Sequence, residues 1–233
     1  MILAINTSTV QFGLALLTDQ GIVISECLIS PGSKNFKGFM PGIASLFENS
    51  SKEINELNAI IVVKGPGSFT GLRVGLSTAK GMAQGLQIPI IGVSGLEVMA
   101  SQLSNTQLSI CPLIDSRKGE VFFALFRNND GSLMRVSDDQ SIKIQDICSV
   151  VEGETIFIGN DFGKQGNLIR ELFGDKAVLA PPYLWNLRAS AVGAFGLQRF
   201  SASDFDDSRD LVPSYMRPPD IRTNPFPLLK SRC

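Results

Sequence analysis

A glycine-rich block at residues 65–75 is the strongest candidate for chemistry in this sequence. It reads GPGSFTGLRVG, follows a short apolar run and opens a predicted helix. Backbone N–H groups and the dipole at a helix N-terminus favour an anion, so Gly65, Gly67 and Ser68 are candidate phosphate contacts. The glycine spacing fits neither a Walker loop nor the G-x-G-x-x-G pattern of dinucleotide-binding proteins. A plain strand-to-helix turn with Ser68 or Thr70 as the N-cap is therefore the favoured interpretation.

A polar turn at residues 6–8 is a second candidate phosphate contact. Asn6, Thr7 and Ser8 end the first predicted strand. In sugar kinases, actin and Hsp70-like proteins such a turn approaches the phosphates of ATP, and an aspartate there helps to place Mg²⁺. Asn6 cannot supply the carboxylate charge that Mg²⁺ prefers. An Asx or Ser/Thr turn that only links two strands explains these residues equally well, and residues 115–117 have the same two interpretations.

The composition narrows the chemistry further. The chain has 233 residues, of which 21 are basic, 22 are acidic and none is histidine. Without histidine it cannot build a Ser-His or Cys-His couple, a histidine-ligated zinc site or an imidazole acid–base. A formal net charge of −1 disfavours a self-sufficient nucleic-acid binder, which needs clustered Lys and Arg. The acidic residues form no defensible acid–base pair, so no catalytic residue, metal or cofactor is expected.

The cysteines and the apolar segments indicate the cellular compartment in which the protein is expected. The four cysteines lie far apart without a C-x-x-C pair, which is typical of reduced thiols in a cytosolic protein. The N-terminus has no basic segment before its apolar run, so no signal peptide is expected. No run approaches about 18 apolar residues, so no membrane span is expected either. These features predict a cytoplasmic protein without membrane contact.

The apolar pattern that must position these turns is typical of an α/β protein. A strand at 60–63, the glycine turn, a helix at 70–86 and a strand at 88–93 form a βαβ unit. The other main expected elements are strands at 2–5, 12–17, 22–29 and 155–159, and helices at 36–47, 95–103, 163–173 and 189–200.

A weak internal repeat predicts two similar lobes. The pattern of strand, polar turn, strand and glycine turn in residues 3–21 can be aligned with residues 113–131. This comparison places an N-terminal lobe at 1–105 and a C-terminal lobe at 106–212. Residues 213–233 form a proline-rich, locally basic tail, which is expected to pack on the surface or to be partly disordered.

The helix expected at 70–86 carries small residues at every fourth position. One row consists of Gly71, Gly75, Ala79 and Ala83, and a second of Gly81 and Gly85. Each glycine inside a helix costs about 1 kcal/mol relative to alanine, so several together need a compensating contact. Close approach of another helix supplies one, and by composition that helix belongs equally well to this chain or to a partner.

Several segments together resemble the TsaB family, also called YeaZ. They are residues 1–8, 65–75, 80–83, 91–94, 115–121 and 213–217, in the family's order over nearly the whole chain. The resemblance implies an α/β protein of the actin-like, Hsp70-like (ASKHA) fold, with two duplicated lobes of mixed sheet flanked by helices. The chain departs from the family at Asn6, where relatives usually have aspartate, and at residues 33–41, where they usually have a histidine.

The resemblance also implies a function without chemistry of its own. TsaB-like proteins pair with the catalytic homologue TsaD and with the ATPase TsaE. The complex transfers threonylcarbamoyl from threonylcarbamoyl-AMP to N6 of the adenosine beside the anticodon in ANN-decoding tRNAs, and this chain is expected to meet tRNA through the complex. Its expected role is that of a scaffold and dimerisation subunit that activates TsaD. The alternatives are an ATP-dependent phosphotransferase of the same fold and a glycoprotease-like peptidase.

In the family, the interface is a helical bundle made by the first two helices of each partner. These helices correspond to residues 36–47 and 70–86, so the first small-residue row is expected to face a partner. The predicted interface residues are Phe36, Phe39, Met40, Ile43, Gly71, Leu72, Gly75, Ala79 and Ala83. A homodimer through the same face is the alternative for the free protein. Gly75→Arg is expected to abolish TsaD binding and to leave the chain folded.

Overall fold

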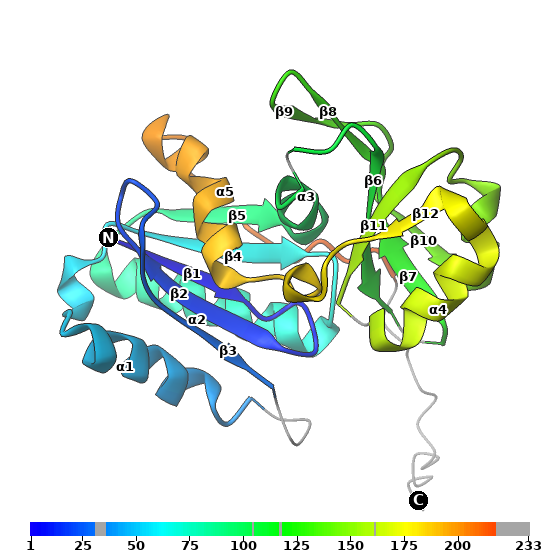
Figure 1. Cartoon of the computed structure of the whole chain (residues 1–233). Helices are drawn as coiled ribbons and strands as arrows, with labels where there is room; N and C mark the ends of the chain where they lie inside the picture. Colours follow the sequence, from blue (N-terminus) through cyan, green and yellow to red (C-terminus); the bar gives the residue numbers. More distant parts are fainter. Residues whose placement is uncertain (31–35, 104, 117, 161, 218–233) are drawn as a thin grey trace, which may run out of the picture.

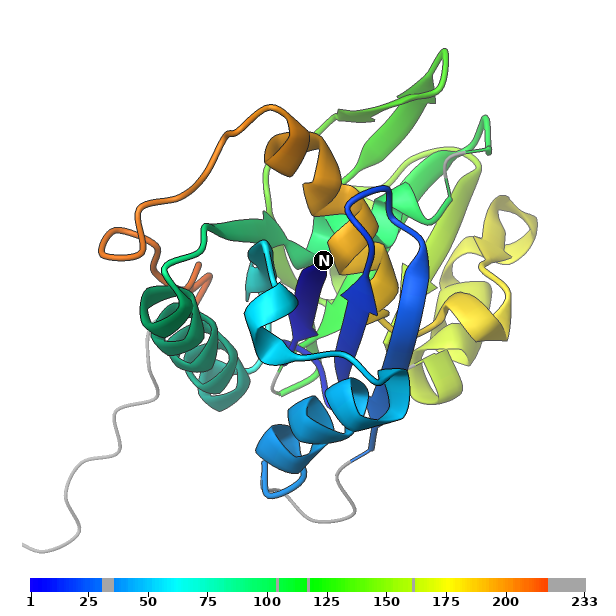
Figure 2. The ribbon, with the colours of Figure 1, turned by 90° about the vertical axis from the view of Figure 1, so that its left-hand side faces the viewer.

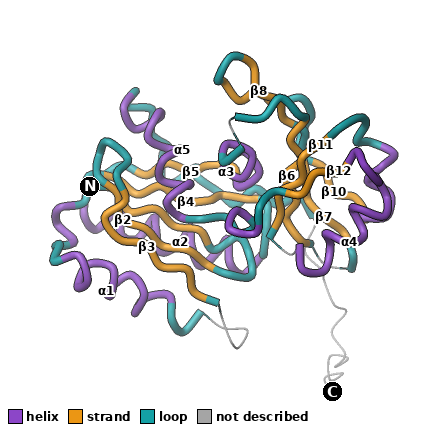
Figure 3. The backbone as a smooth tube through the Cα atoms, in the orientation of Figure 1, coloured by secondary structure: helices purple, strands orange, loops and turns teal. Residues whose placement is uncertain are grey.

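Two β-sheets of mixed strand direction form the framework of the chain (Figures 1 and 3). The computed structural model describes residues 1–30, 36–103, 105–116, 118–160 and 162–217. The first sheet has the strand order β3-β2-β1-β4-β5. Its strands are β1 (Ile2–Asn6), β2 (Phe12–Leu17), β3 (Val23–Ile29), β4 (Ala59–Gly65) and β5 (Ile90–Ser94).

The first sheet is antiparallel on one side and parallel on the other. β2 pairs antiparallel with both β1 and β3, while β4 is parallel to both β1 and β5. Short turns can join only antiparallel neighbours, whereas the parallel neighbours β4 and β5 need the crossover helix that the βαβ pattern predicts. β1 and β2 are fully buried, and they are accordingly uninterrupted apolar runs up to Asn6.

Helices cover both faces of the first sheet (Figures 1 and 2). On one face lie α1 (Phe39–Ser50) and α2 (Phe69–Leu86), which share a core with β1, β2 and β4. On the other face lie α3 (Gly95–Ser101) and α5 (Ala189–Ser201), which share a core with both sheets. Pro41 occupies the first turn of α1, where a backbone N–H has no intrahelical partner, so the helix continues through it.

The second sheet repeats the strand order of the first. It runs β10-β7-β6-β11-β12, and the hairpin β8–β9 joins β6 off this path. β6 is antiparallel to β7 and parallel to β11, and β11 is parallel to β12. Its elements are β6 (Ser109–Asp115), β7 (Glu120–Phe123), β8 (Phe126–Asn129), β9 (Ser132–Arg135), β10 (Gln140–Lys143), β11 (Thr155–Gly159), β12 (Ala177–Leu179) and α4 (Phe162–Phe173). Short 3₁₀ segments are η1 (Ile54–Glu56), η2 (Ile144–Ser149), η3 (Gly174–Lys176) and η4 (Pro182–Leu184).

This repeat confirms the expected actin-like α/β fold with two similar lobes, but the packing of α5 differs from the expected lobe boundary. α5 comes from the sequence assigned to the second lobe, yet it packs on β1, β2 and their neighbours in the first sheet. The approach is so close that a Cβ on Gly193 would overlap Leu17, and one on Gly196 would overlap Ile61. By packing, α5 therefore belongs to the first lobe.

The chain after α5 also returns to the first lobe, as a segment that we call the strap (residues 204–217). Asp206 makes a single antiparallel bridge to Ile90 on the edge strand β5. Leu211 is buried in the core beneath α2. The strap thus includes residues 213–217, which are the first residues of the expected surface tail. The rest of that tail, residues 218–233, lies outside the described residues. No helix within the described ranges is long and apolar enough to cross a membrane.

Candidate functional site

The polar turn after β1 is buried and satisfied by its own hydrogen bonds. The Asn6 Oδ1 atom accepts hydrogen bonds from the Ser8 amide at 3.0 Å and from the Ser8 hydroxyl at 2.7 Å. The Asn6 Nδ2 group donates to the Leu187 carbonyl at 2.9 Å and to Thr9 Oγ1 at 3.1 Å. This is the pattern of an Asx turn, and it also ties the turn to the segment that leads into α5.

The glycine-rich block sits directly on this turn. The Ser68 amide donates to the Ser8 carbonyl at 2.7 Å, and the Thr7 hydroxyl donates to the Gly71 carbonyl at 2.7 Å. A Cβ on Gly67 would overlap the Ser8 carbonyl, and one on Gly71 would overlap the Thr7 carbonyl. Glycine is therefore needed here because two backbones approach closely.

The two candidate phosphate turns thus form one packed joint. Among the predicted phosphate contacts, the structure brings together Asn6, Thr7, Ser8, Gly67 and Ser68, whereas Gly65 faces Ser214 of the strap. Ser68 is the N-cap of α2, since its hydroxyl accepts a hydrogen bond from the Gly71 amide at 3.3 Å. The close backbone contact occupies the space between the turns, which favours the structural interpretation over phosphate binding.

The corresponding turn of the second lobe is held by the strap and by α4. The Asp115 amide donates to Asn160 Oδ1 at 2.8 Å, and Gln165 Nε2 donates to Asp115 Oδ1 at 3.1 Å. Arg217, at the end of the strap, forms an ion pair with Glu120 at 3.2 Å. Arg217 therefore connects the strap to the second lobe.

The first small-residue row of α2 faces inward, contrary to the sequence prediction. Gly71, Leu72, Gly75, Ala79 and Ala83 are all buried within the chain. A Cβ on Gly75 would overlap Thr7 Oγ1, so the row lets α2 lie close to the end of β1. The expectation that these residues form an exposed docking stripe is wrong, because another part of the same chain already covers them.

The predicted interface residues of the first helix are also mostly internal. Phe39 and Ile43 are buried in the core under α1, and Phe36 is half-buried with its ring centroid 5.8 Å from that of Phe12. Met40 is 56% exposed and faces solvent. Of the predicted interface residues, Met40 is therefore the one that a partner could contact fully.

The surface that remains open to a partner is the opposite side of the same two helices. A Cβ on Gly81 or Gly85 would meet nothing within 4 Å, so the second small-residue row points outward. We call the outer face the set of exposed residues Met40, Ala44, Ser77, Gly81 and Gly85. The sequence contained both rows, but their equal spacing could not show which one faces the core.

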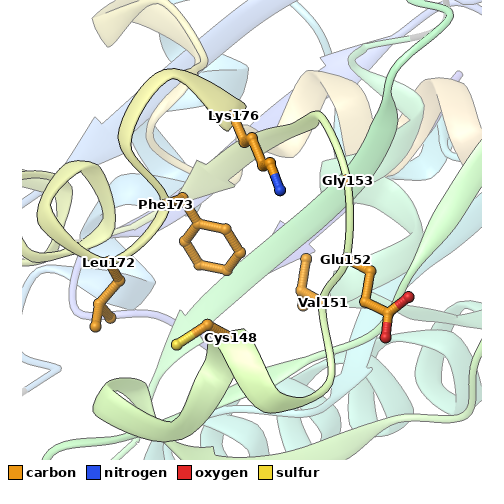
Figure 4. Close-up of a pocket in the computed structure, with 7 residues that line it drawn as sticks. All are labelled: Cys148, Val151, Glu152, Gly153, Leu172, Phe173 and Lys176. Atoms are coloured by element: carbon orange, nitrogen blue, oxygen red, sulfur yellow. The ribbon is translucent and has the colours of Figure 1, made fainter.

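A cavity of about 450 Å³ opens in the second lobe (Figure 4). It is lined by Cys148, Val151, Glu152, Gly153, Leu172, Phe173 and Lys176. Figure 4 shows the Phe173 ring in the middle of the opening and the Glu152 carboxylate pointing away from it. Sequence reasoning missed this cavity because its residues come from separate segments. In the described part of the chain, no group of His, Cys, Asp and Glu residues could hold a metal ion.

The cysteine environments predict a selective reaction with thiol reagents. Cys148 is exposed at the cavity, whereas Cys111 is buried, and burial raises the pKa of the Cys111 thiol well above its usual range. Because the thiolate is the nucleophile, iodoacetamide at about pH 8 should label Cys148 in the folded chain and leave Cys111 unmodified. Peptide mass mapping after quenching measures this, with Cys148→Ser as the control. Labelling of Cys111 without unfolding would contradict the described burial.

Comparisons with known proteins agree on one family. A family model described as TsaD, tRNA N6-adenosine threonylcarbamoyltransferase, matches residues 34–187. The tRNA threonylcarbamoyladenosine biosynthesis protein TsaB of Bacillus subtilis is 32% identical over 219 residues, which cover 93% of each chain.

Solved structures with this architecture are similar over most of their length. YeaZ from Pseudomonas aeruginosa has a TM-score of 0.75 at 19% identity, covering 92% of this chain and 99% of that chain. Component A of (R)-2-hydroxyglutaryl-CoA dehydratase from Acidaminococcus fermentans has a TM-score of 0.51 at 10% identity, covering 87% of this chain and 98% of that chain. These two similarities concern the fold alone. From the family model and the Bacillus subtilis relative, the chain belongs to the TsaB (YeaZ) family.

Proposed function

We propose that this chain is a non-catalytic scaffold and dimerisation subunit in tRNA threonylcarbamoyladenosine biosynthesis, where it holds and activates TsaD. The observation that carries this proposal is the similarity to a Bacillus subtilis TsaB named for that pathway, 32% identical over 93% of the chain. In the complex, TsaD transfers threonylcarbamoyl to N6 of the adenosine beside the anticodon in ANN-decoding tRNAs. TsaE and the tRNA join through the complex, in the cytoplasm.

Two features of the chain support a role without chemistry of its own. The turn at Asn6 uses its amide group for hydrogen bonds to Ser8, Thr9 and Leu187, where a nucleotide-binding relative would keep a carboxylate for Mg²⁺. The chain also has no histidine, the metal ligand that the family resemblance implies for TsaD. Both features favour a scaffold over an ATP-dependent phosphotransferase or a metal-dependent peptidase.

We infer that TsaD docks on the outer face of α1 and α2. Gly81 and Gly85 leave the backbone of α2 open to close approach by another helix, and Met40 adds an exposed apolar side chain on α1. Exposed glycines inside a helix cost about 1 kcal/mol each, and a partner helix compensates for that cost. A homodimer of the free chain would use the same face.

Reconstitution with single omissions tests this function. The chain is co-expressed with TsaD and TsaE from its own organism, and the purified mixture is given tRNA, ATP and threonylcarbamoyl-AMP. We expect co-purification with TsaD, and we expect modified nucleoside only when this chain is present. Mass spectrometry of digested tRNA measures the product.

The contrary results are equally clear. Full tRNA modification without the chain would rule out an activating role. Modification that needs the chain although it never co-purifies with TsaD would rule out the scaffold mechanism. A threonylcarbamoyl transfer activity of the isolated chain would show that it is an enzyme itself.

A further inference from the structure

The side chain of Arg73, on the solvent side of α2, packs against two neighbouring aromatic rings. Its guanidinium carbon lies 3.9 Å from the ring centroid of Phe69 and 5.8 Å from that of Tyr215. Its Nε group donates a hydrogen bond to the Tyr215 hydroxyl at 2.9 Å, and the two rings lie 4.8 Å apart. Cation–π contact and this hydrogen bond fix the orientation of an otherwise flexible side chain.

The strap fixes Tyr215 in turn, although Tyr215 lies 142 residues from Arg73 in the sequence. The amide of the preceding Ser214 donates to the Lys64 carbonyl at 2.7 Å. Two residues further on, Arg217 pairs with Glu120 of the second lobe at 3.2 Å. Figure 2 shows the orange strap returning from α5 to α2. Tyr215 is thus anchored on both sides, and it can orient Arg73.

The two terminal nitrogens of Arg73 are left for an outside acceptor. The side chain is exposed, and among the described residues only its Nε atom has a hydrogen-bond partner. A free arginine loses much rotamer entropy when it binds, but this one has already lost it. A guanidinium with a fixed plane and a free pair of N–H groups suits a carboxylate, which it can bind in a bidentate manner.

The surroundings of Arg73 favour a protein partner over a nucleic acid. Arg73 precedes Ser77 and Gly81 by one and two helical turns, so it lies at the end of the outer face. Those neighbours are uncharged, and the nearby Lys80 already donates to the Leu211 carbonyl at 3.2 Å. Binding to a nucleic-acid backbone requires several cationic side chains spaced along the phosphates, whereas a single carboxylate requires only one guanidinium.

We propose that Arg73 anchors a carboxylate side chain of the TsaD partner, and that Tyr215 is its positioning residue. This inference rests on the proposed function, because it names the contact at one end of the docking face. It also gives the strap an indirect role in docking. The strap orients Arg73, and Arg73 is the residue that binds the partner.

Titration of the full chain against purified TsaD, at low and high salt, tests the inference. Arg73→Gln should weaken binding by about tenfold or more, because the partner carboxylate loses its charge-assisted hydrogen bonds. Arg73→Lys should recover little, since an ammonium cannot form the fork. Tyr215→Phe keeps the ring but removes the acceptor for Nε, and should weaken binding several-fold. Arg209→Gln is the control. It changes an exposed arginine of the strap that carries Tyr215, and this variant should bind TsaD normally.

The outcomes separate this inference from the proposed function. Added salt should weaken binding of the unchanged chain more than binding of Arg73→Gln. If the unchanged chain and Arg73→Gln bind TsaD equally, the inference fails and the scaffold function stands. If Arg73→Gln binds TsaD normally but the assembled complex retains less tRNA, Arg73 contacts phosphate and the carboxylate assignment is wrong. If the unchanged chain does not bind TsaD, both proposals fail. Thermal unfolding of each variant confirms that it is folded.

Discussion

Gly81→Arg is expected to abolish binding to TsaD while the chain stays folded. Nothing lies within 4 Å of a Cβ at Gly81, so the new side chain extends into solvent. Arginine is a better helix former than glycine by about 1 kcal/mol, and α2 should therefore become slightly more stable. In a docked complex, the same side chain would separate two closely packed helices and bury an unpaired charge, at a cost of several kcal/mol.

The measurement is a binding titration against TsaD together with urea unfolding of each variant. Loss of affinity of about a hundredfold or more is expected for Gly81→Arg. Gly163→Arg is the matched control, because Gly163 also lies in an exposed helical position with no atom near its Cβ, but on α4 in the other lobe. Normal binding by Gly81→Arg would remove the outer face from the interface.

Substitutions at Gly75 are expected to destabilise the fold itself, in contrast to the prediction made from the sequence. A Cβ there would overlap Thr7 Oγ1, whose hydrogen bond to the Gly71 carbonyl holds α2 on the first strand. Gly75→Ala should lower the free energy of unfolding by about 1–3 kcal/mol, because packed interiors do not yield easily. Gly75→Arg should prevent folding, since it adds a long charged side chain to the same joint.

Gly85→Ala is the matched control for Gly75→Ala. It makes the same change in the same helix at a position with no neighbouring atom, so it should raise the free energy of unfolding by about 1 kcal/mol. Urea denaturation of both variants measures the contrast. In a double-mutant cycle, Thr7→Ala should reduce the cost of Gly75→Ala, because it removes the overlapping hydroxyl. Equal effects of the two glycine substitutions would contradict the inward orientation of the first row.

Local patterns in the sequence were sufficient to predict the fold class. The βαβ unit predicted around the glycine-rich block corresponds to β4, α2 and β5 in the structure. The N-cap of α2 is Ser68, one of the two residues that the pattern predicts for it. The weak internal repeat of residues 3–21 in residues 113–131 corresponds to two sheets with the same strand order. These features are short-range or repeated, so apolar periodicity and turn residues are enough to reveal them.

The candidate site was harder to predict, because the sequence shows which residues the two turns contain but not what surrounds them. The turn at residues 6–8 and the glycine-rich block each favoured either a phosphate or a structural turn. Only their contact, with Gly71 against a residue 64 positions earlier, shows that they pack on each other. Likewise, no local signal connects Arg73 with Tyr215, since the strap brings together two residues that are 142 positions apart in the sequence.

The sequence by itself determined the family, the α/β class, the duplicated lobes and the absence of histidine chemistry. Tertiary structure alone decided which side of α2 is buried. Both small-residue rows repeat every fourth position, so helical periodicity treats them alike. The buried row is the one whose missing side chains let α2 approach Thr7 at the end of β1, and that approach depends on contacts between distant parts of the chain. The row with Gly81 and Gly85 is consequently the one left for a partner.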